Sequence, residues 1–313
     1  MAKKRKPRIL ILGLPYFGRM LEGLLAKRGW EASFAEHPGR ALRGWARLIP
    51  KVQRADVIYL IGSRIERNSP QDILMRVRRK PVVIHWVGTD VQIALDEAKA
   101  GRVSRRIAER AIHWCDAPWL VDELATIGVV SEEVALPVPG LPAEPPPLPE
   151  RFCALLYCPV DAYDREVFDL DTLLRHPVEF PDIEFVLIPS PAETLPGPLP
   201  SNLDCRGWVD DIDTLYREIS LYVRLTSHDG VSFMVLECLA RGRHVIWPFP
   251  MPGVTQASGF EAVAAVVREL AAKHTAGTLS LNEEGRAHVM AHYDAERLTR
   301  ELSARLRAVL RPG

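Results

Sequence analysis

The sequence of 313 residues contains no CxxC pair, and its cysteines are odd in number. These five cysteines are scattered along the chain, at Cys115, Cys153, Cys158, Cys205 and Cys238. Disulfide frameworks use cysteines in pairs, and structural zinc sites use closely spaced thiolates. We therefore expect reduced thiols in a cytoplasmic protein, without a metal site.

Long apolar runs and net charge are also absent. No stretch approaches the roughly 18 apolar residues of a membrane span, and "ILILGL" is too short for the core of a signal peptide. The 40 basic side chains are balanced by 40 acidic ones, which argues against a partner such as nucleic acid. The basic start, "MAKKRKPR", is expected to be a short solvated tail.

The common phosphate-binding motifs are missing as well. The first glycine-containing turn, Gly13 to Gly18, reads "GLPYFG" and is neither GxGxxG nor a P-loop, which disfavours a nicotinamide-dependent oxidoreductase. No Asp-x-Asp motif lies where a divalent ion could bridge phosphates, since "VDDID" (209–213) is typical of a helix start. We expect no obligatory metal or cofactor.

The chain does contain regular alternation of apolar strands and amphipathic helices, which predicts βαβ units and parallel sheets. In the first half the expected strands are "RILILGL", "EASFAE", "ADVIYLIG" and "PVVIHWVG". "SPQDILMRVRRK" is expected to be a helix capped by Ser69, and "RRIAERAIHWCD" a helix leading into "APWLV".

A proline-rich stretch divides the chain, because prolines disfavour helices and inner strands. The expected strands beyond it are "FCALLYCPV", "IEFVLIPS", "LDCRGW", "LYVRLT" and "HVIWPF". We predict a fold of the α/β class with two Rossmann-like domains facing each other across a cleft. The predicted boundaries are an N-terminal domain at 1–140, a linker at 141–151, a C-terminal domain at 152–295 and a closing amphipathic helix at 296–313.

Ligands of parallel sheets gather at the carboxyl ends of strands, so three turns are candidate sites. Backbone N–H groups between Gly13 and Gly18 could hold an anion, or the turn could be a tight connection. In "HWVGTD", His85 could donate to a sugar hydroxyl or phosphate. Alternatively, His85 is bonded to nearby backbone and Asp90 caps a helix.

The third turn, in "VRLTSHDGVSFMVLECLARGRHVIW", places Asp229 at its mouth and Glu237 inside an otherwise apolar helix. A buried carboxylate needs a partner, and carboxylates accept hydrogen bonds from vicinal hydroxyls. Two acids eight residues apart could contact the two ends of one hydroxyl-rich ligand. The alternative is that Asp229 is a helix N-cap and Glu237 is incidental.

The stretch "HDGVSFMVLECLARGRHVI" resembles the donor-site signature of retaining GT-B glycosyltransferases, particularly family GT4, and weaker similarity covers most of the chain. The resemblance implies a GT-B fold and transfer of a sugar from a nucleotide-diphosphate donor, the co-substrate. It implies that Asp229, where the family usually has Glu, contacts the transferred sugar, with Glu237 on the ribose. The donor site would include Gly230, Val231 and Ser232. "IHWVGTD" is similar to an acceptor-domain turn of the family, which implies that His85 contacts a sugar hydroxyl or the developing charge.

The sequence departs from this family after "LLYC", where an Arg and a Lys usually hold the diphosphate. The stretch "PVDAYDREVFD" has acids instead, so Arg165, Arg224 or Arg206 are the candidate replacements. Loss of the usual pair leaves a second hypothesis open: a GT-B-like protein that binds a nucleotide or glycan without turnover.

The acceptor is expected to be a small molecule, a glycan or a lipid-linked sugar. Residues Arg40 to Arg54, "RALRGWARLIPKVQR", are basic with an apolar edge. They could lie against a membrane surface, and the protein would then contact the membrane peripherally, without a transmembrane segment. The alternative is an ordinary amphipathic helix that packs Leu42, Trp45 and Leu48 on the core.

Overall fold

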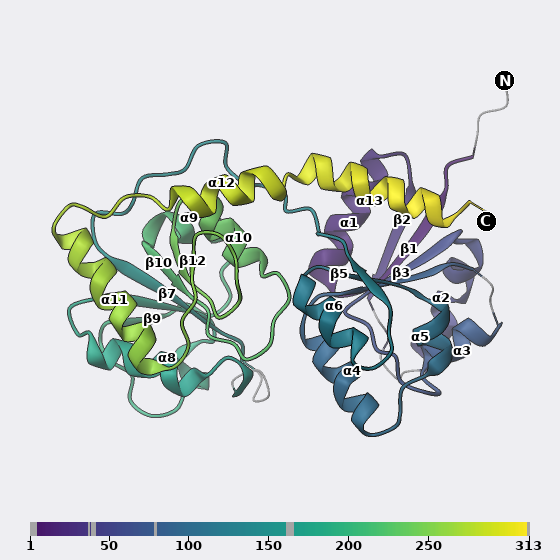
Figure 1. Ribbon diagram of the computed structural model, residues 1–313, viewed down its shortest axis with the longest axis horizontal. Coiled ribbons are helices and arrows are strands. Elements are labelled where there is room, and N and C mark those ends of the chain that lie inside the picture. The colour runs from purple at the N-terminus through teal and green to yellow at the C-terminus, as the bar shows by residue number, and fades with distance from the viewer. Residues whose placement is uncertain (1–4, 37, 39–41, 78–79, 161–165, 312–313) are drawn as a thin grey trace. The chain divides into compact units, whose positions relative to one another are not determined.

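The computed structural model describes residues 5–36, 38, 42–77, 80–160 and 166–311. Contacts between Cα atoms divide the chain into two compact units. Unit 1 consists of Met1–Pro137, Asp229–Val231 and Ala295–Gly313, and unit 2 of Val138–His228 and Ser232–Asp294. Each unit contains one parallel sheet with helices packed against it (Figure 1).

The sheet of unit 1 has six parallel strands. Their spatial order is β2 (Glu31–Glu36), β1 (Arg8–Gly13), β3 (Val57–Ile61), β4 (Val82–Trp86), β5 (Ile112–Cys115) and β6 (Ser131–Glu133). The apolar runs predicted from the sequence form β1, β3 and β4. All side chains of β3 and β4 are buried, as expected for parallel strands covered by helices on both faces.

The helices of unit 1 are α1 (Pro15–Lys27), α2 (Leu42–Arg54), α3 (Pro70–Val77), α4 (Thr89–Lys99), α5 (Arg105–Arg110), α6 (Pro118–Ala125) and α13 (Ala295–Val309). The Ser69 hydroxyl caps α3 by accepting the Asp72 N–H at 3.2 Å, as predicted. Helix α2 buries Leu48, while the side chains of Leu42 and Trp45 lie outside those that the structure describes.

One segment of the first half differs from its prediction. "RRIAERAIHWCD" is not a single helix, because α5 ends at Arg110 and residues Ile112–Cys115 form β5. "APWLV", for which no structure was predicted, begins α6 at Pro118. Strand β5 is only four residues long and follows α5 almost directly, so no turn residue separates the two in the sequence.

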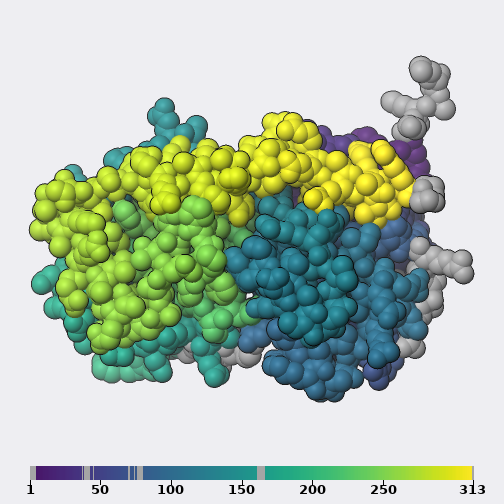
Figure 2. Space-filling view, in the orientation of Figure 1, coloured from purple at the N-terminus to yellow at the C-terminus, as the bar shows by residue number. Residues whose placement is uncertain are grey.

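Helix α13 packs against unit 1 along its apolar stripe, where Leu298, Leu302 and Leu306 are buried. The Trp30 indole donates to the Ser303 hydroxyl at 2.9 Å. Figure 1 shows this last helix beside α1, and Figure 2 shows its yellow surface along one edge of unit 1. The C-terminal segment therefore belongs to the same compact unit as the N-terminal strands.

Unit 2 also has a parallel sheet of six strands. Their spatial order is β12 (Val254–Thr255), β11 (His244–Ile246), β10 (Leu221–Val223), β7 (Cys153–Cys158), β8 (Glu184–Pro189) and β9 (Leu203–Cys205). Five of the six were predicted; the two-residue β12 is too short to show an apolar pattern. The helical segments are α8 (Leu170–Glu179), the 3₁₀ turn η1 (Ala192–Thr194), α9 (Ile212–Glu218), α10 (Phe233–Ala240), α11 (Phe260–Thr275) and α12 (Glu283–His292).

Cationic side chains of unit 2 hold the proline-rich stretch in place. The Arg243 guanidinium is fully buried and donates to the carbonyl oxygens of Pro147 at 2.8 Å and Pro146 at 3.3 Å. Arg286 donates to Ala143 O at 2.5 Å. These carbonyls have no partner within an extended segment, so the arginines supply the hydrogen bonds that a helix or sheet would.

Candidate functional site

The strand order of unit 2 creates a topological switch point between β7 and β10. From β7 the chain continues through β8 and β9 on one side of the sheet, and then through β10, β11 and β12 on the other. Where two such connections leave in opposite directions, a crevice opens at the carboxyl ends of the strands, and ligands of α/β sheets bind there. The turn from Arg224 to Ser232 starts at this point, at the carboxyl end of β10.

Glu237 lies on α10, whose other side chains from Phe233 to Ala240 are nearly all buried. Its carboxylate is half-buried and accepts a hydrogen bond from the Tyr216 hydroxyl at 2.6 Å. Burial raises the pKa of Glu237, against the opposing effects of the Tyr216 hydrogen bond and nearby Arg241. The sequence predicted that this buried acid needs a partner, and Tyr216 on α9 is one such partner.

Arg241 braces the Tyr216 ring. Its guanidinium carbon lies 4.9 Å from the ring centroid, and its Nε donates to Asp213 at 2.9 Å. A second hydrogen bond runs from Arg241 Nη1 to the backbone oxygen of Glu237 at 3.0 Å. The tyrosine and the glutamate are thus held in a fixed orientation before any ligand arrives.

The last four residues of the turn between β10 and α10, from Asp229 to Ser232, are buried. Asp229, Val231 and Ser232 are 8%, 7% and 8% exposed, and Gly230 is buried too. The N-cap of α10 is Ser232. The alternative in which Asp229 is the helix N-cap is therefore wrong, because Asp229 precedes the cap by three residues.

Arg224 follows β10 directly and is 8% exposed. Its guanidinium carbon lies 4.8 Å from the ring centroid of Tyr157 and 4.8 Å from that of Phe168. Arg206, by contrast, follows the edge strand β9. Its guanidinium forms two ion pairs, with Asp204 at 2.7 Å and with Glu218 at 2.6 Å. The third candidate cation, Arg165, lies outside the described residues.

His85 is placed by β4 in the core of the other sheet, where no part of its side chain is exposed. Its Nδ1 shares a hydrogen bond with the Tyr59 hydroxyl, and its ring meets Trp114 edge-on at 6.2 Å. Burial lowers the pKa of His85 to about 3, so the ring is neutral. This setting favours the alternative of a histidine bonded within the protein, to the Tyr59 hydroxyl and to the backbone of Val134.

Asp90, five residues later, accepts the N–H groups of Val87 at 3.1 Å and Val91 at 3.0 Å. The N-cap position of α4 is Gly88, so Asp90 lies in the first turn and is not the cap itself. Burial raises its pKa to about 7.

Gly13 and Gly18 flank the switch point of the unit 1 sheet, where β2 and β3 lie on opposite sides of β1. A Cβ on Gly13, which has φ +133°, would lie 1.8 Å from the Ile61 carbonyl oxygen. A Cβ on Gly18 would meet the Phe34 ring at 2.2 Å. Close packing therefore explains both glycines, and the predicted anion contact stays a prediction.

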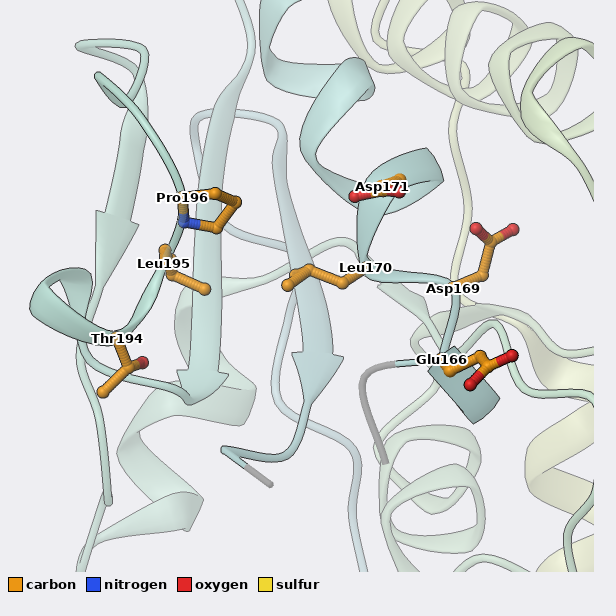
Figure 3. A pocket seen from close by; sticks show the side chains of 7 residues that line it. All are labelled: Glu166, Asp169, Leu170, Asp171, Thr194, Leu195 and Pro196. Atoms are coloured by element: carbon orange, nitrogen blue, oxygen red, sulfur yellow. The ribbon is translucent and has the colours of Figure 1, made fainter. Parts of the chain in front are cut away.

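A cavity of about 580 Å³ in unit 2 was not predicted from the sequence (Figure 3). It lies between the start of α8 and the segment that follows η1, both on the carboxyl side of the sheet. Its lining consists of Glu166, Asp169, Leu170, Asp171, Thr194, Leu195 and Pro196. In Figure 3 Leu170 and Leu195 point toward each other, and the carboxylates of Glu166 and Asp169 lie beyond Leu170. The cavity has no signal in the sequence, because its lining residues come from two separate segments of the chain.

The residues that the structure describes contain neither a cluster of metal ligands nor a membrane-spanning helix. Among them, no three histidine, cysteine, aspartate or glutamate side chains are grouped as metal ligands. No helix in the described part of the chain is both long and apolar enough to cross a membrane.

Several solved structures share the fold of this chain. Sucrose-phosphate synthase from Thermosynechococcus elongatus aligns with a TM-score of 0.74 at 14% identity, over 97% of this chain and 99% of that one. The glycotransferase of kitacinnamycin aligns with a TM-score of 0.54 at 12% identity, over 98% and 100% of the two chains. The pneumococcal O-GlcNAc transferase GtfA, in complex with UDP and GlcNAc, aligns with a TM-score of 0.56 at 9% identity, over 86% of this chain and 60% of that one. No protein-family model and no curated protein sequence matches.

These structures define the class to which the fold belongs. The chain has the GT-B architecture of glycosyltransferases, with two Rossmann-like α/β domains, as the sequence predicted. Identities of 9 to 14% establish the fold alone.

Proposed function

We propose that this protein is a retaining glycosyltransferase of the GT4 type, which transfers a sugar from a nucleotide-diphosphate donor. One observation carries the proposal: in a GT-B fold, β10 lies at the switch point of the second sheet, and the turn and helix that follow it bear the acids Asp229 and Glu237. Switch points of parallel sheets are where nucleotides bind, and carboxylates suit the hydroxyl groups of ribose and sugar.

Glu237 is the proposed ribose contact. Vicinal hydroxyls donate to a carboxylate, and hydrogen bonds to a charged acceptor are stronger than those between neutral groups. The Tyr216 hydroxyl donates a hydrogen bond to Glu237 Oε2 and so fixes the orientation of the carboxylate. Less side-chain freedom is then lost when the nucleotide binds.

Asp229 is the proposed contact to the transferred sugar, with Gly230, Val231 and Ser232 beside it. A carboxylate at this position would hold the sugar hydroxyls while the anomeric carbon gains positive charge. Unit 1 would bind the acceptor, which stays unspecified among small molecules, glycans and lipid-linked sugars. The bound UDP of the pneumococcal transferase supports a nucleotide donor, and a cytoplasmic location is part of the proposal.

The first test is a thermal-shift screen of nucleotide-diphosphate sugars with the wild type, Glu237→Gln and a matched control. Ligands that bind only the folded state raise the melting temperature. The substitution Glu237→Gln keeps the shape and an acceptor for Tyr216 but removes the charge, so we expect about 10- to 100-fold weaker binding. The control is Glu261→Gln, which changes an exposed glutamate in the first turn of α11.

Binding of one nucleotide family by the wild type and the control, with a loss in Glu237→Gln, would support the donor site. If no nucleotide sugar shifts the wild type, the proposal fails. Hydrolysis of the bound donor separates the transferase from the second hypothesis, a GT-B-like binding protein without turnover. That alternative is favoured by the absence of the usual Arg and Lys after β7 and by Asp229, where the family usually has Glu.

A further inference from the structure

Arg224 lies where the two halves of the unit 2 sheet diverge. Its backbone N–H donates to Ile246 O at 3.0 Å and extends the β10–β11 ladder by one residue. The register pairs Val223 with Leu156, so Arg224 stands beside Tyr157 on the neighbouring strand β7. Arg224 is 8% exposed and lies at the carboxyl edge of the central strands, the edge at which nucleotides bind to α/β sheets.

Two aromatic rings hold this guanidinium. Tyr157 and Phe168 each have their centroid 4.8 Å from the guanidinium carbon, and their rings meet edge-on at 5.4 Å. A cation within about 6 Å of an aromatic face is attracted by the ring quadrupole, and more so where water is excluded. The rings also restrict the rotamers of a long side chain, so the planar donor fork keeps a fixed orientation.

We propose that Arg224 is the cation that binds the donor diphosphate in this protein, and that Tyr157 and Phe168 are its positioning residues. The inference rests on the proposed function. A guanidinium can donate two parallel hydrogen bonds to phosphate oxygens, which a lysine ammonium cannot. No bond is made or broken at Arg224; it stabilises the charge that the leaving diphosphate gains as the sugar departs.

Arg206 is the less suitable candidate. It follows the edge strand β9, which lies two strands away from β7, and its guanidinium already pairs with Asp204 and Glu218. Two carboxylates neutralise its charge, so a phosphate there would meet net negative charge. This makes Arg206 a matched control for Arg224.

The test compares each nucleoside with its diphosphate. We would measure the affinities of uridine, guanosine and adenosine, and of UDP, GDP and ADP, for the wild type, Arg224→Gln, Arg224→Lys and Arg206→Gln. The quantity of interest is the ratio of diphosphate to nucleoside affinity. We expect this ratio to fall about 10- to 100-fold in Arg224→Gln, because a hydrogen bond to a charged group is lost, and less in Arg224→Lys. The nucleoside affinity itself should stay, since the ribose contact is elsewhere.

The positioning role has its own variants. Tyr157→Leu and Phe168→Leu should lower the same ratio several-fold while the charge of Arg224 is retained. Tyr157→Phe keeps the aromatic face and should leave the ratio unchanged. Melting temperatures of the ligand-free variants identify any variant that fails to fold. If Arg224→Gln fails to fold, Arg224→Lys and Tyr157→Phe still allow the comparison.

A ratio that falls in the Arg224 and Leu variants, but not in Arg206→Gln, supports the proposal. A wild type that prefers a diphosphate, with the same preference in both Arg224 variants, overturns the role of Arg224 and leaves the glycosyltransferase standing. A fall in Arg206→Gln alone assigns the diphosphate to Arg206 and also overturns it. If the wild type binds no diphosphate, the proposed function fails, and this inference with it.

Discussion

At the scale of single residues, the site was only half visible in the sequence. Glu237 was identifiable because an acid in an apolar helix is costly and must have a reason. Its partner Tyr216 was not, because the two are 21 positions apart on different helices. The contact of Arg224 with two aromatic rings could not be predicted from the sequence either, since Phe168 lies 56 residues before it in the chain. Sequence patterns reveal which groups need partners, and only packing reveals which partners they have.

Asp90 gives a prediction at this scale, on the pH dependence of stability. Burial raises the pKa of Asp90 to about 7 in the folded protein, against 3.8 for an unperturbed aspartate. Between these values the unfolded chain has lost the proton while the folded protein keeps it, so the stability contributed by this group falls as pH rises from about 4 to 7. The full effect is at most about 4 kcal/mol, at about 1.4 kcal/mol per pKa unit.

Asp90→Asn removes this titration and keeps a side-chain oxygen to accept the Val87 N–H. We expect the variant to gain stability relative to the wild type as pH increases through this window, with no further gain above about pH 7. Urea unfolding at pH 4, 5.5 and 7.5 measures the difference. A constant difference across these pH values would show that Asp90 is ionised throughout.

At the scale of secondary structure, the sequence was most informative where segments are long and apolar. Strands β1, β3, β4 and β7 were predictable because parallel strands covered on both faces are continuous apolar runs. Strand β5 was missed because Ile107 and Ala111, in and just after α5, continue at helical spacing into Ile112 and Cys115. A four-residue strand without a turn before it has no signal of its own.

The proline-rich segment yields the prediction at this scale. Arg243 is fully buried and donates to the carbonyl oxygens of Tyr216, Pro146 and Pro147. Arg243→Met removes all three hydrogen bonds and leaves the buried carbonyl of Tyr216 without this donor. We expect a loss of about 3 kcal/mol or more, since hydrogen bonds from a charged donor contribute about 1.5–3 kcal/mol each and are not additive.

Urea unfolding measures the stability, and limited proteolysis after Pro147 reports whether the segment is released. Arg268→Met is the control, because its guanidinium is exposed and its ion pair with Glu179 is long, at 3.4 Å. We expect the control to change stability by less than about 0.5 kcal/mol. Equal effects of the two substitutions would contradict an anchoring role for Arg243.

At the scale of the whole molecule, each unit has a parallel sheet with its own switch point, but the two differ in chemistry. In unit 1 the switch point is closed by close packing of Gly13 against β3, and the nearby histidine is buried and neutral. In unit 2 it carries the buried Arg224, and the helix that follows bears Glu237, which Tyr216 orients. The GT-B fold was predictable from two rounds of strand–helix alternation, whereas this difference depends on side-chain packing.

The difference predicts which part of the molecule a nucleotide protects. If ribose and diphosphate bind at Glu237 and Arg224, a nucleoside diphosphate alone should slow amide hydrogen exchange in β7, β10 and α10, because local opening of these elements would cost the binding energy. Peptides from β1 and β2 should exchange as in the ligand-free protein. The measurement is hydrogen exchange with mass spectrometry, with and without the diphosphate that gives the largest thermal shift. The matching nucleoside is the control, and it should protect α10 but not the peptide that contains Arg224. Protection confined to β1 and α1 would instead assign the anion to the turn from Gly13 to Gly18, and unit 1 would then be the nucleotide-binding unit.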